Sequence, residues 1–293
     1  MSTVIVFGAS GLLGASLVPA LRLLGYNVLT QSRSDGADLR LDLYNRTAVM
    51  DVLIQYHPAV VLNLVAETNV DQCEINPQLA WKANAGVVEI LTECIAAFVQ
   101  RLGNPPHLVH LSTDQVYNGL GPHTEKDVNL TNVYGMSKYA GEIFAQRVDS
   151  TVLRTNFYGR SRRPSRVSFT DWLVRSLREK TPITVFDDVK FSAVHIDTLT
   201  KIIAQCIERR PVGVFNAGCR DSISKAGFAF ALAKALNLAT DQVTVGTSAD
   251  LALKARRPTD MSLQVSRLEN VIELQFPTIA GEIEHTAKEY LND

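Results

Sequence analysis

The first two-thirds of the chain alternates short runs of apolar, β-branched residues with longer stretches of helical periodicity. Five runs have the pattern of buried strands: Thr3–Phe7, Val28–Gln31, Val60–Leu64, Leu108–Ser112 and Val152–Arg154. Between them, the apolar spacing predicts helices over Leu12–Leu24, Arg46–Tyr56, Pro77–Arg101 and Tyr134–Arg147. Repeated strand–helix–strand units give right-handed crossovers and a parallel sheet covered on both faces. The pattern therefore predicts an α/β fold with a doubly wound, Rossmann-type parallel sheet.

After Arg154 the alternation loosens and the predicted elements become shorter. We expect a helix over Phe169–Arg178 and a strand over Ile183–Phe186, followed by a return to the main sheet at Val194–Ile207 and Val214–Asn216. No repeat or linker separates two independent domains. The expected division is a dinucleotide-binding domain over 1–156, to which 192–218 return, and a small substrate-binding lobe formed mainly by 157–191 and 219–293.

Composition narrows the class of protein. Of the 293 residues, 46% are hydrophobic and 20% are charged, which suits a packed core and argues against disorder. The net charge of -1 argues against nucleic acid or an anionic membrane as the main partner. Residues Met1–Phe7 lead directly into a glycine turn without a basic segment, so we interpret them as a strand and not as a signal peptide. Four scattered cysteines fit free thiols in a reducing cytoplasm, where we expect the protein.

A glycine-rich turn follows the first predicted strand at once. Gly8-Ala9-Ser10-Gly11-Leu12-Leu13-Gly14 also opens the first predicted helix. Glycines there permit a tight turn and let backbone N–H groups approach a pyrophosphate. The helix N-terminus adds unpaired donors and a partial positive charge. The turn is therefore predicted to bind a dinucleotide cofactor.

The end of the second predicted strand bears on the type of cofactor. An acidic residue there binds the 2′-hydroxyl of NAD, whereas a basic residue suits the 2′-phosphate of NADP. The strand ends in Gln31-Ser32-Arg33-Ser34, with a guanidinium and no acid. NADP, in its reduced form NADPH, is therefore favoured over NAD. Asp42 is placed to reach the adenine.

Two motifs predict a site for hydride transfer. Tyr134-Gly135-Met136-Ser137-Lys138 places a phenol and an ammonium on one face of the fourth helix. Reduction of a ketone leaves an alkoxide that needs a proton, and a tyrosine whose phenolate is stabilised by a nearby lysine can supply it. Ser112 and Thr113 stand at the carboxyl end of the preceding strand, where such sheets bind ligands. The Thr113 hydroxyl is predicted to hold the substrate carbonyl.

With these motifs, the chain resembles the extended short-chain dehydrogenase/reductase superfamily and, within it, the dTDP-4-dehydrorhamnose reductases. The likeness also rests on Ala66-Glu67-Thr68-Asn69-Val70-Asp71, on Asn84 and on Asn132-Val133-Tyr134-Gly135. It extends to Ala255-Arg256-Arg257-Pro258 ahead of Ser266-Arg267-Leu268-Glu269.

The resemblance implies a reductase of a 4-keto-6-deoxy nucleotide-diphosphate sugar. Thr113, Tyr134 and Lys138 would be catalytic, and Asn84 would support a proton-relay water. The residues implied to bind the cofactor are Gly8, Ser10, Gly11, Leu12, Leu13, Gly14, Ser32, Arg33, Asp42, Leu43, Leu64, Val65, Ala66, Thr68, Ser112, Tyr134, Lys138, Asn156 and Phe157. Those implied to bind the substrate are Thr68, Thr113, Asp114, Gln115, Tyr134, Asn156, Arg256 and Arg257.

Departures from the family pattern leave alternatives open. Gln115 stands where an aromatic residue is common, and Phe157 stands where tryptophan is common. We expect no metal site, because no set of ligands has metal-binding spacing. An epimerase or dehydratase that retains NAD is one alternative, and a regulatory subunit resembling that of methionine adenosyltransferase is another. A homodimer and a monomer both remain open.

Overall fold

A seven-stranded sheet is the main element of this computed structural model, which describes residues 2–32, 36–163 and 166–291. Its strand order is β11-β6-β5-β4-β1-β2-β3, and the pairs from β6 through β3 are parallel. The order runs outward from β1 in both directions, which confirms the predicted doubly wound arrangement. The strands are β1 (Thr3–Phe7), β2 (Asn27–Ser32), β3 (Leu39–Arg40), β4 (Val60–Asn63), β5 (His107–Leu111), β6 (Ser150–Thr155) and β11 (Gly213–Ala217).

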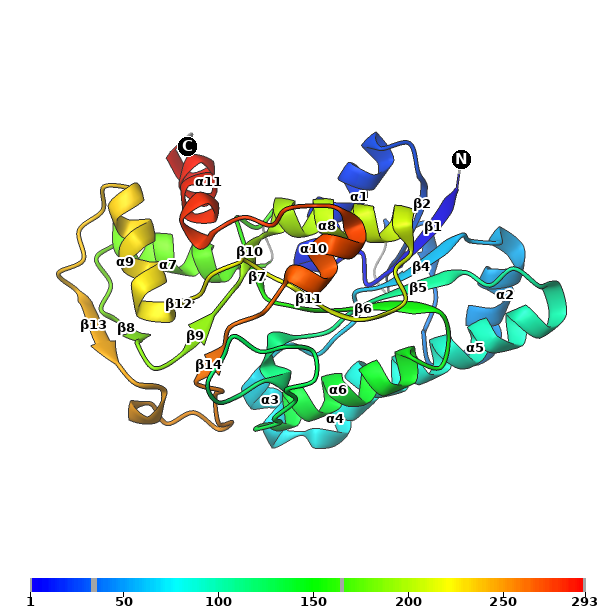
Figure 1. Cartoon of the computed structure of the whole chain (residues 1–293), viewed down its shortest axis with the longest axis horizontal. Coiled ribbons are helices and arrows are strands. Elements are labelled where there is room, and N and C mark those ends of the chain that lie inside the picture. Colours follow the sequence, from blue (N-terminus) through cyan, green and yellow to red (C-terminus); the bar gives the residue numbers. More distant parts are fainter. Residues whose placement is uncertain (1, 33–35, 164–165, 292–293) are drawn as a thin grey trace. The chain divides into compact units, whose positions relative to one another are not determined.

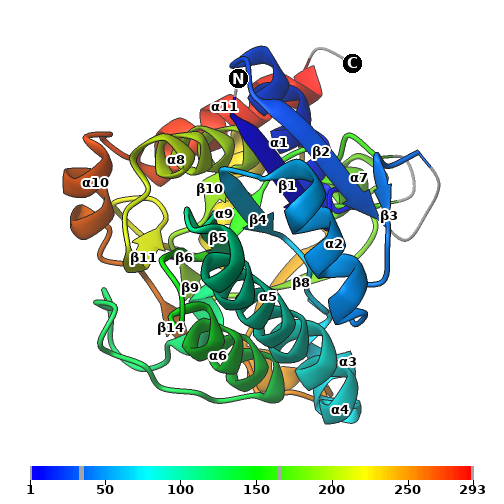
Figure 2. The same ribbon diagram turned by 90° about the vertical axis from the view of Figure 1, so that its right-hand side faces the viewer.

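Helices cover both faces of this sheet. Helices α1 (Leu12–Leu23) and α8 (Ile196–Arg209) lie on one face, and α2 (Arg46–Tyr56), α5 (Val87–Leu102) and α6 (Val133–Ala145) lie on the other (Figure 2). Strands β4 and β5 are buried along their whole length, as a sheet covered on both sides requires. Among the described residues, no helix is both long and apolar enough to span a membrane.

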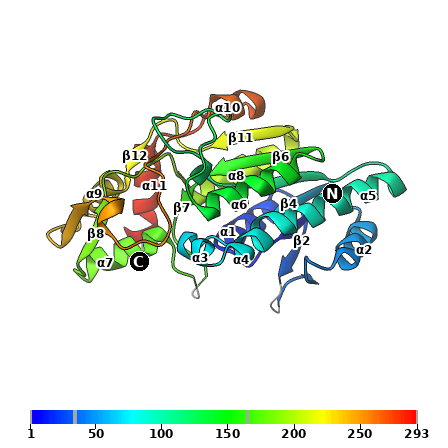
Figure 3. The same ribbon diagram turned by 90° about the horizontal axis from the view of Figure 1, so that it is seen from below.

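The single helix predicted over Pro77–Arg101 is interrupted. Helix α4 (Pro77–Trp81) passes through a π-helical turn at Lys82–Gly86 into α5, and the three segments run beside α6 (Figure 3). A π turn inserts an extra residue and is frequent at functional sites. A further helix, α3 (Val70–Ile75), was not predicted, because six residues are too few to show helical periodicity.

The contacts divide the chain into two units. The first contains Met1–Thr113, Asn132–Arg154 and Thr200–Phe215, and with them most of the sheet. The second contains Asp114–Thr131, Thr155–Leu199 and Asn216–Asp293. Its helices are α7 (Phe169–Arg178), α9 (Lys225–Ala235), α10 (Ser266–Ile272) and α11 (Ile279–Leu291), and its short strands are β7 (Phe157–Tyr158), β8 (Ile183–Phe186), β9 (Lys190–Phe191), β10 (Val194–His195), β12 (Ile223–Ser224), β13 (Val243–Gly246) and β14 (Asp260–Met261) (Figure 1).

The core of the first unit sets a prediction about stability. Leu91 of α5 is fully buried in a cluster with Ile5, Val61 and Leu108 from the sheet. We expect Leu91→Ala to lower the free energy of unfolding by about 2–5 kcal/mol, because the lost contacts leave a cavity. Leu23→Ala is the matched control: this leucine of α1 is 89% exposed, and its loss should cost less than about 0.5 kcal/mol. Urea denaturation measures both, and equal losses would contradict the assignment of this core.

Candidate active site

The glycine turn after β1 has the geometry of an anion-binding site. Gly8 has a φ of +78°, in the region that favours glycine. A Cβ on Gly14 would stand 2.4 Å from the Ala9 carbonyl oxygen, so only glycine lets α1 pack this closely. Gly11 is the N-cap residue of α1, and no side chain caps this helix. The N–H groups of the first turn therefore remain for a ligand, and the turn fits the pyrophosphate of a dinucleotide.

A buried glutamine, Gln31, fixes this turn, a role that was not predicted from the sequence. Gln31 at the end of β2 is 3% exposed. Its Oε1 accepts the Gly8 N–H at 3.2 Å, and its Nε2 donates to the Leu41 carbonyl at 2.8 Å. Gln31 therefore ties the glycine turn to the segment that carries Asp42 and Leu43. Asp42 is exposed beside this segment, whereas Arg33 lies outside the described residues.

The end of β4 is held by a second buried amide. Asn63 Oδ1 accepts the Val65 N–H at 3.1 Å, and Nδ2 lies 3.1 Å from His110 Nδ1. Burial, and then the charge of Lys138, holds the pKa of His110 well below its usual value, so the ring is neutral and accepts this bond. Val65 N also lies 3.0 Å from where a Gly8 Cβ would stand. The structure thus brings the predicted cofactor residues at the ends of β1 and β4 together, at the switch point of the sheet.

Helix α6 carries the predicted tyrosine and lysine. Tyr134 is 8% exposed and Lys138 is 2% exposed. The Lys138 ammonium donates to the Leu111 carbonyl at the end of β5, directly before Ser112 and Thr113. Burial lowers the pKa of Lys138 to about 8, although Glu142 acts in the opposite direction. The lysine is thereby fixed at the carboxyl end of β5, next to the residues predicted to hold the substrate.

Asn84 lies in the π-helical turn and joins three segments. Its Oδ1 accepts the Glu67 N–H at 2.8 Å, while Nδ2 donates to the Glu67 carbonyl at 3.1 Å and to Ser137 Oγ at 2.9 Å. Ser137 in turn donates to the Tyr134 carbonyl at 2.8 Å. Asn84 therefore positions both the loop that carries Thr68 and the first turn of α6. The proton-relay water expected at Asn84 stays a prediction.

A buried ion pair anchors the far side of α6. Arg154 of β6 bonds both oxygens of Glu142, with Nη2 at 2.6 Å from Oε2 and Nε at 3.0 Å from Oε1. The two side chains are 3% and 0% exposed. Ser112 also donates to Glu142. This contact fixes α6 against β5 and β6.

The second unit contains six of the predicted site residues: Asp114, Gln115, Asn156, Phe157, Arg256 and Arg257. Asp114 is 1% exposed and accepts a bond from Asn156 Nδ2 at 2.8 Å. Gln115 and Phe157 are partly buried, and Arg256 is exposed. Arg257 donates to the Ala255 carbonyl at 2.9 Å. The structure thus brings two of the predicted substrate-binding residues, Asp114 and Asn156, into direct hydrogen-bond contact.

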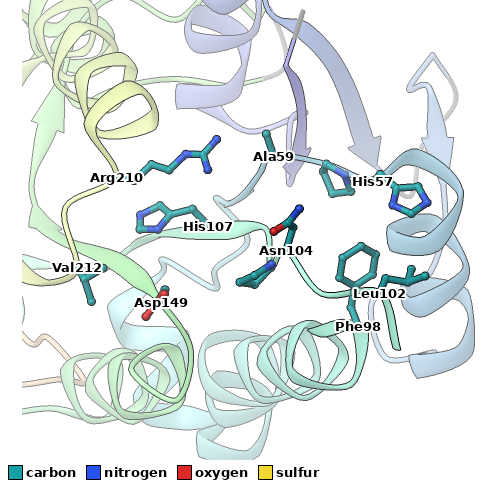
Figure 4. Close-up of a pocket in the computed structure, with 11 residues that line it drawn as sticks. His57, Ala59, Phe98, Leu102, Asn104, His107, Asp149, Arg210 and Val212 are labelled. Carbon is teal, nitrogen blue, oxygen red and sulfur yellow. The ribbon is translucent and has the colours of Figure 1, made fainter. Parts of the chain in front are cut away.

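A cavity of about 660 Å³ in the first unit is not this site. It is lined by residues such as His57, His107, Asp149 and Arg210 (Figure 4). His107 begins β5 and Asp149 precedes β6, so the cavity lies at the amino ends of the strands. The glycine turn, Ser112 and Thr113 stand at the carboxyl ends. Burial, and then Arg210, lowers the pKa of His107 to about 4, so its ring is neutral there.

The buried pair under α6 gives a prediction about stability. We expect Glu142→Gln to lower the free energy of unfolding by about 3–5 kcal/mol, because Arg154 is left as a buried charge without its counter-ion. The double variant Glu142→Gln/Arg154→Met should recover part of this loss. Arg22→Gln is the control, since its pair with Asp38 is about half exposed and should contribute at most ~1 kcal/mol. Guanidinium denaturation measures all three, and a loss at Glu142 no larger than at Arg22 would refute the role of this pair.

The chain is similar to known proteins over its whole length. The family model of the RmlD substrate binding domain matches residues 1–292. The spore coat polysaccharide biosynthesis protein SpsK of Bacillus subtilis is 30% identical, over 88% of this chain and 87% of the relative. The dTDP-4-dehydrorhamnose reductase of Aggregatibacter actinomycetemcomitans is 25% identical, over 94% of this chain and 95% of the relative. Subunit beta of methionine adenosyltransferase 2 from Danio rerio is also 25% identical, over 91% and 84%.

Solved structures agree with these relatives. The crystal structure of the dTDP-4-dehydrorhamnose reductase of Bacillus anthracis in complex with NADP matches with a TM-score of 0.86 and 26% identity. The match covers 99% of this chain and 100% of that chain. Together with the glycine turn and the Tyr134–Lys138 pair, these comparisons identify the chain as a member of the RmlD substrate-binding domain family, the dTDP-4-dehydrorhamnose reductase branch of the NAD(P)-dependent short-chain oxidoreductases.

Proposed function

We propose that this protein is an NADPH-dependent reductase of a 4-keto-6-deoxy nucleotide-diphosphate sugar. The observation that carries the proposal is the arrangement of α6. Tyr134 and Lys138 stand one turn apart, and the Lys138 ammonium is buried against the carboxyl end of β5, beside Ser112 and Thr113. A doubly wound sheet binds its ligands at this end. The reductase names of the relatives support the same reaction.

The side chains of the first unit have distinct roles in this reaction. The glycine turn Gly8–Gly14 would hold the nicotinamide dinucleotide, which would supply the hydride for the carbonyl carbon of the substrate. The Tyr134 hydroxyl donates its proton to the carbonyl oxygen as negative charge develops there. Lys138 stabilises the resulting phenolate, since a pKa of about 8 keeps it protonated at neutral pH. Thr113 orients the carbonyl by a hydrogen bond, and Asn84 orders the water that restores the proton.

The two units would divide the binding of the two ligands. We propose that the first unit is the dinucleotide-binding domain and that the glycine turn, Gln31 and Asn63 set its geometry. We propose that the second unit binds the sugar nucleotide. Asp114, Gln115 and Asn156 would recognise the sugar, and Arg256 with Arg257 the diphosphate, because a planar guanidinium binds phosphate oxygens in pairs. Four buried free thiols are compatible with the cytoplasm as the place of action.

A direct assay tests the reaction. Purified protein, NADPH and dTDP-4-dehydrorhamnose or dTDP-4-keto-6-deoxyglucose are mixed, oxidation is followed by the absorbance of the reduced nicotinamide, and the product is identified. We expect Tyr134→Phe to lower kcat by about 10²–10⁴-fold, because it removes the proton donor. Tyr139→Phe on the same helix is the matched control and should keep the wild-type rate.

The other outcomes of this assay separate the alternatives. NADPH binding without oxidation of any keto sugar would overturn the reductase proposal and favour a regulatory subunit, the role suggested by the methionine adenosyltransferase relative. NAD that stays bound through purification, with sugar conversion but no net oxidation, would favour an epimerase or dehydratase.

Cofactor preference gives a separate prediction. Arg33 directly follows β2, and the sequence of the strand end, Leu29-Thr30-Gln31-Ser32-Arg33-Ser34, contains no acidic residue to bind a 2′-hydroxyl. We expect Arg33→Ala to lower the ratio of kcat/KM for NADPH to that for NADH by roughly 10-fold or more, through loss of a charge-assisted bond to the 2′-phosphate. Arg101→Ala, at the end of α5, should leave the ratio unchanged. If Arg33→Ala leaves this ratio as unchanged as Arg101→Ala does, residues other than Arg33 determine the preference for NADPH.

A further inference from the structure

One lysine of the second unit carries a charge that no acceptor of this unit satisfies. Lys225 is the first residue of helix α9, directly after the N-cap residue Ser224. Its backbone N–H donates to the Val189 carbonyl at 2.9 Å, which fixes the residue beside strand β9. Its ammonium can only donate, and none of the described residues accepts a hydrogen bond from it. Within this part of the chain, the acceptors left for Lys225 are those of solvent or of a ligand.

Two aromatic rings hold the ammonium in place. Nζ lies 3.7 Å from the centre of the Phe191 ring and 4.7 Å from that of the Phe169 ring. An ammonium at these distances is attracted by the negative face of each ring. The residue is partly buried, and burial lowers the pKa of Lys225 to about 8, although the charge of Asp114 acts in the opposite direction. The two rings therefore keep the positive charge at one defined point of the unit.

The stability of α9 does not explain a lysine at this position. A cation in the first turn of a helix stands at the positive end of the helix dipole, which is unfavourable. An apolar side chain would pack on Phe169 and Phe191 without this repulsion and without the partial burial of a charge. Lys234, in the last turn of the same helix, is exposed and has the favourable placement. Binding of a ligand accounts for Lys225 better than folding does.

The surroundings of Lys225 indicate the kind of ligand. The Asp114 carboxylate acts on the pKa of Lys225, yet no hydrogen bond joins the two groups. Asp114 also accepts the Asn156 amide at 2.8 Å, and it directly follows Thr113 in the chain. Asp114 and Asn156 belong to the proposed sugar-binding set. A phosphate here would add negative charge beside Asp114, whereas a sugar hydroxyl is neutral and accepts a hydrogen bond from an ammonium.

We propose that Lys225 is a further substrate-binding residue, whose ammonium donates a hydrogen bond to a hydroxyl oxygen of the sugar ring. The inference rests on the proposed reductase function. In this role Lys225 binds the sugar away from the reacting carbonyl, so it contributes to affinity and not to the chemical step. Phe169 and Phe191 act as positioning residues, because they hold the ammonium without using any of its hydrogen bonds.

Substitution by methionine tests this role, because its unbranched side chain keeps the packing on the two rings and removes the charge. In the keto-sugar assay we expect Lys225→Met to raise the KM for the sugar nucleotide by roughly 10–100-fold, through loss of a hydrogen bond from a charged donor. The kcat and the KM for NADPH should stay within about twofold of the wild-type values. Lys234→Met on the same helix is the matched control and should keep all three constants. Circular dichroism should show the same helix content in both variants.

Binding without turnover identifies the group that Lys225 contacts. Calorimetry compares dTDP-glucose and UDP-glucose, which carry a sugar without a keto group, with dTDP and UDP, which end in the diphosphate. We expect Lys225→Met to weaken binding of the sugar nucleotide by roughly 10-fold or more and to leave binding of the corresponding diphosphate unchanged. Equal weakening of both would place Lys225 at the diphosphate and overturn the proposal.

Failure of this proposal and failure of the reductase function have different signatures. An active Lys225→Met enzyme with an unchanged KM for the sugar nucleotide would overturn the role of Lys225 and leave the reductase function intact. A wild type that reduces no keto sugar would overturn the reductase function, and the calorimetric comparison would still decide whether Lys225 binds a sugar. A wild type that binds none of the four nucleotides would overturn both.

Discussion

The buried ion pair between Glu142 and Arg154 is the contact on which the proposed site depends most. Taking both charges out of water is costly, and the pair is favourable only because its geometry is bidentate and Ser112 supplies a further hydrogen bond. The pair joins α6 to β6, and Ser112 joins both to the end of β5. Since Tyr134 and Lys138 lie on α6, the pair fixes the helix that carries them against the strands β5 and β6. Because hydrogen bonds are directional, the Glu142–Arg154 pair fixes α6 at one position on the sheet, whereas apolar packing alone would allow the helix to shift slightly along it.

A second buried polar contact, made by Asn84, fixes the position of α6 from its other side. Its amide meets Glu67 and Ser137, which are 17 and 53 residues away in the chain. A regular helix would turn residue 84 to a different angle, and the π turn at Lys82–Gly86 gives the extra rotation that aims Asn84 at these partners. Gly141 leaves the space, because a Cβ there would stand 2.3 Å from the Asn84 carbonyl oxygen. The local irregularity of the helix is thus compensated by three hydrogen bonds.

These buried polar contacts could not be predicted from the sequence, although much of the fold could. The strands and the glycine turn were predictable because they follow from local pattern, and β1, α2, α7 and β8 have the predicted bounds. The π turn was not, since Asn84 and Gly86 lower the helix propensity of this stretch without indicating how the backbone register changes there. Gln31 and Asn63 could have been noticed as polar residues that end apolar strands, yet their partners depend on tertiary packing. The predicted roles of Asp114, Gln115 and Arg256 rest on resemblance, because side-chain chemistry alone does not select a sugar.

The second unit obeys the same rule of buried polar partners. Glu282 of α11 is 4% exposed and accepts bonds from the His195 N–H and from Thr198 Oγ1, so it satisfies donors at the start of α8 that the helix itself cannot. Glu289, two turns further along α11, bonds the His195 ring. An apolar residue in place of Glu282 or Glu289 would leave a buried N–H donor without an acceptor. The C-terminal helix α11 therefore packs on β10 and the start of α8 through these two glutamates. The second ring nitrogen of His195, Nδ1, accepts the Asp197 N–H at 3.2 Å. The start of α8 and the C-terminal helix are thus joined through a buried histidine whose backbone N–H and two ring nitrogens are all hydrogen-bonded.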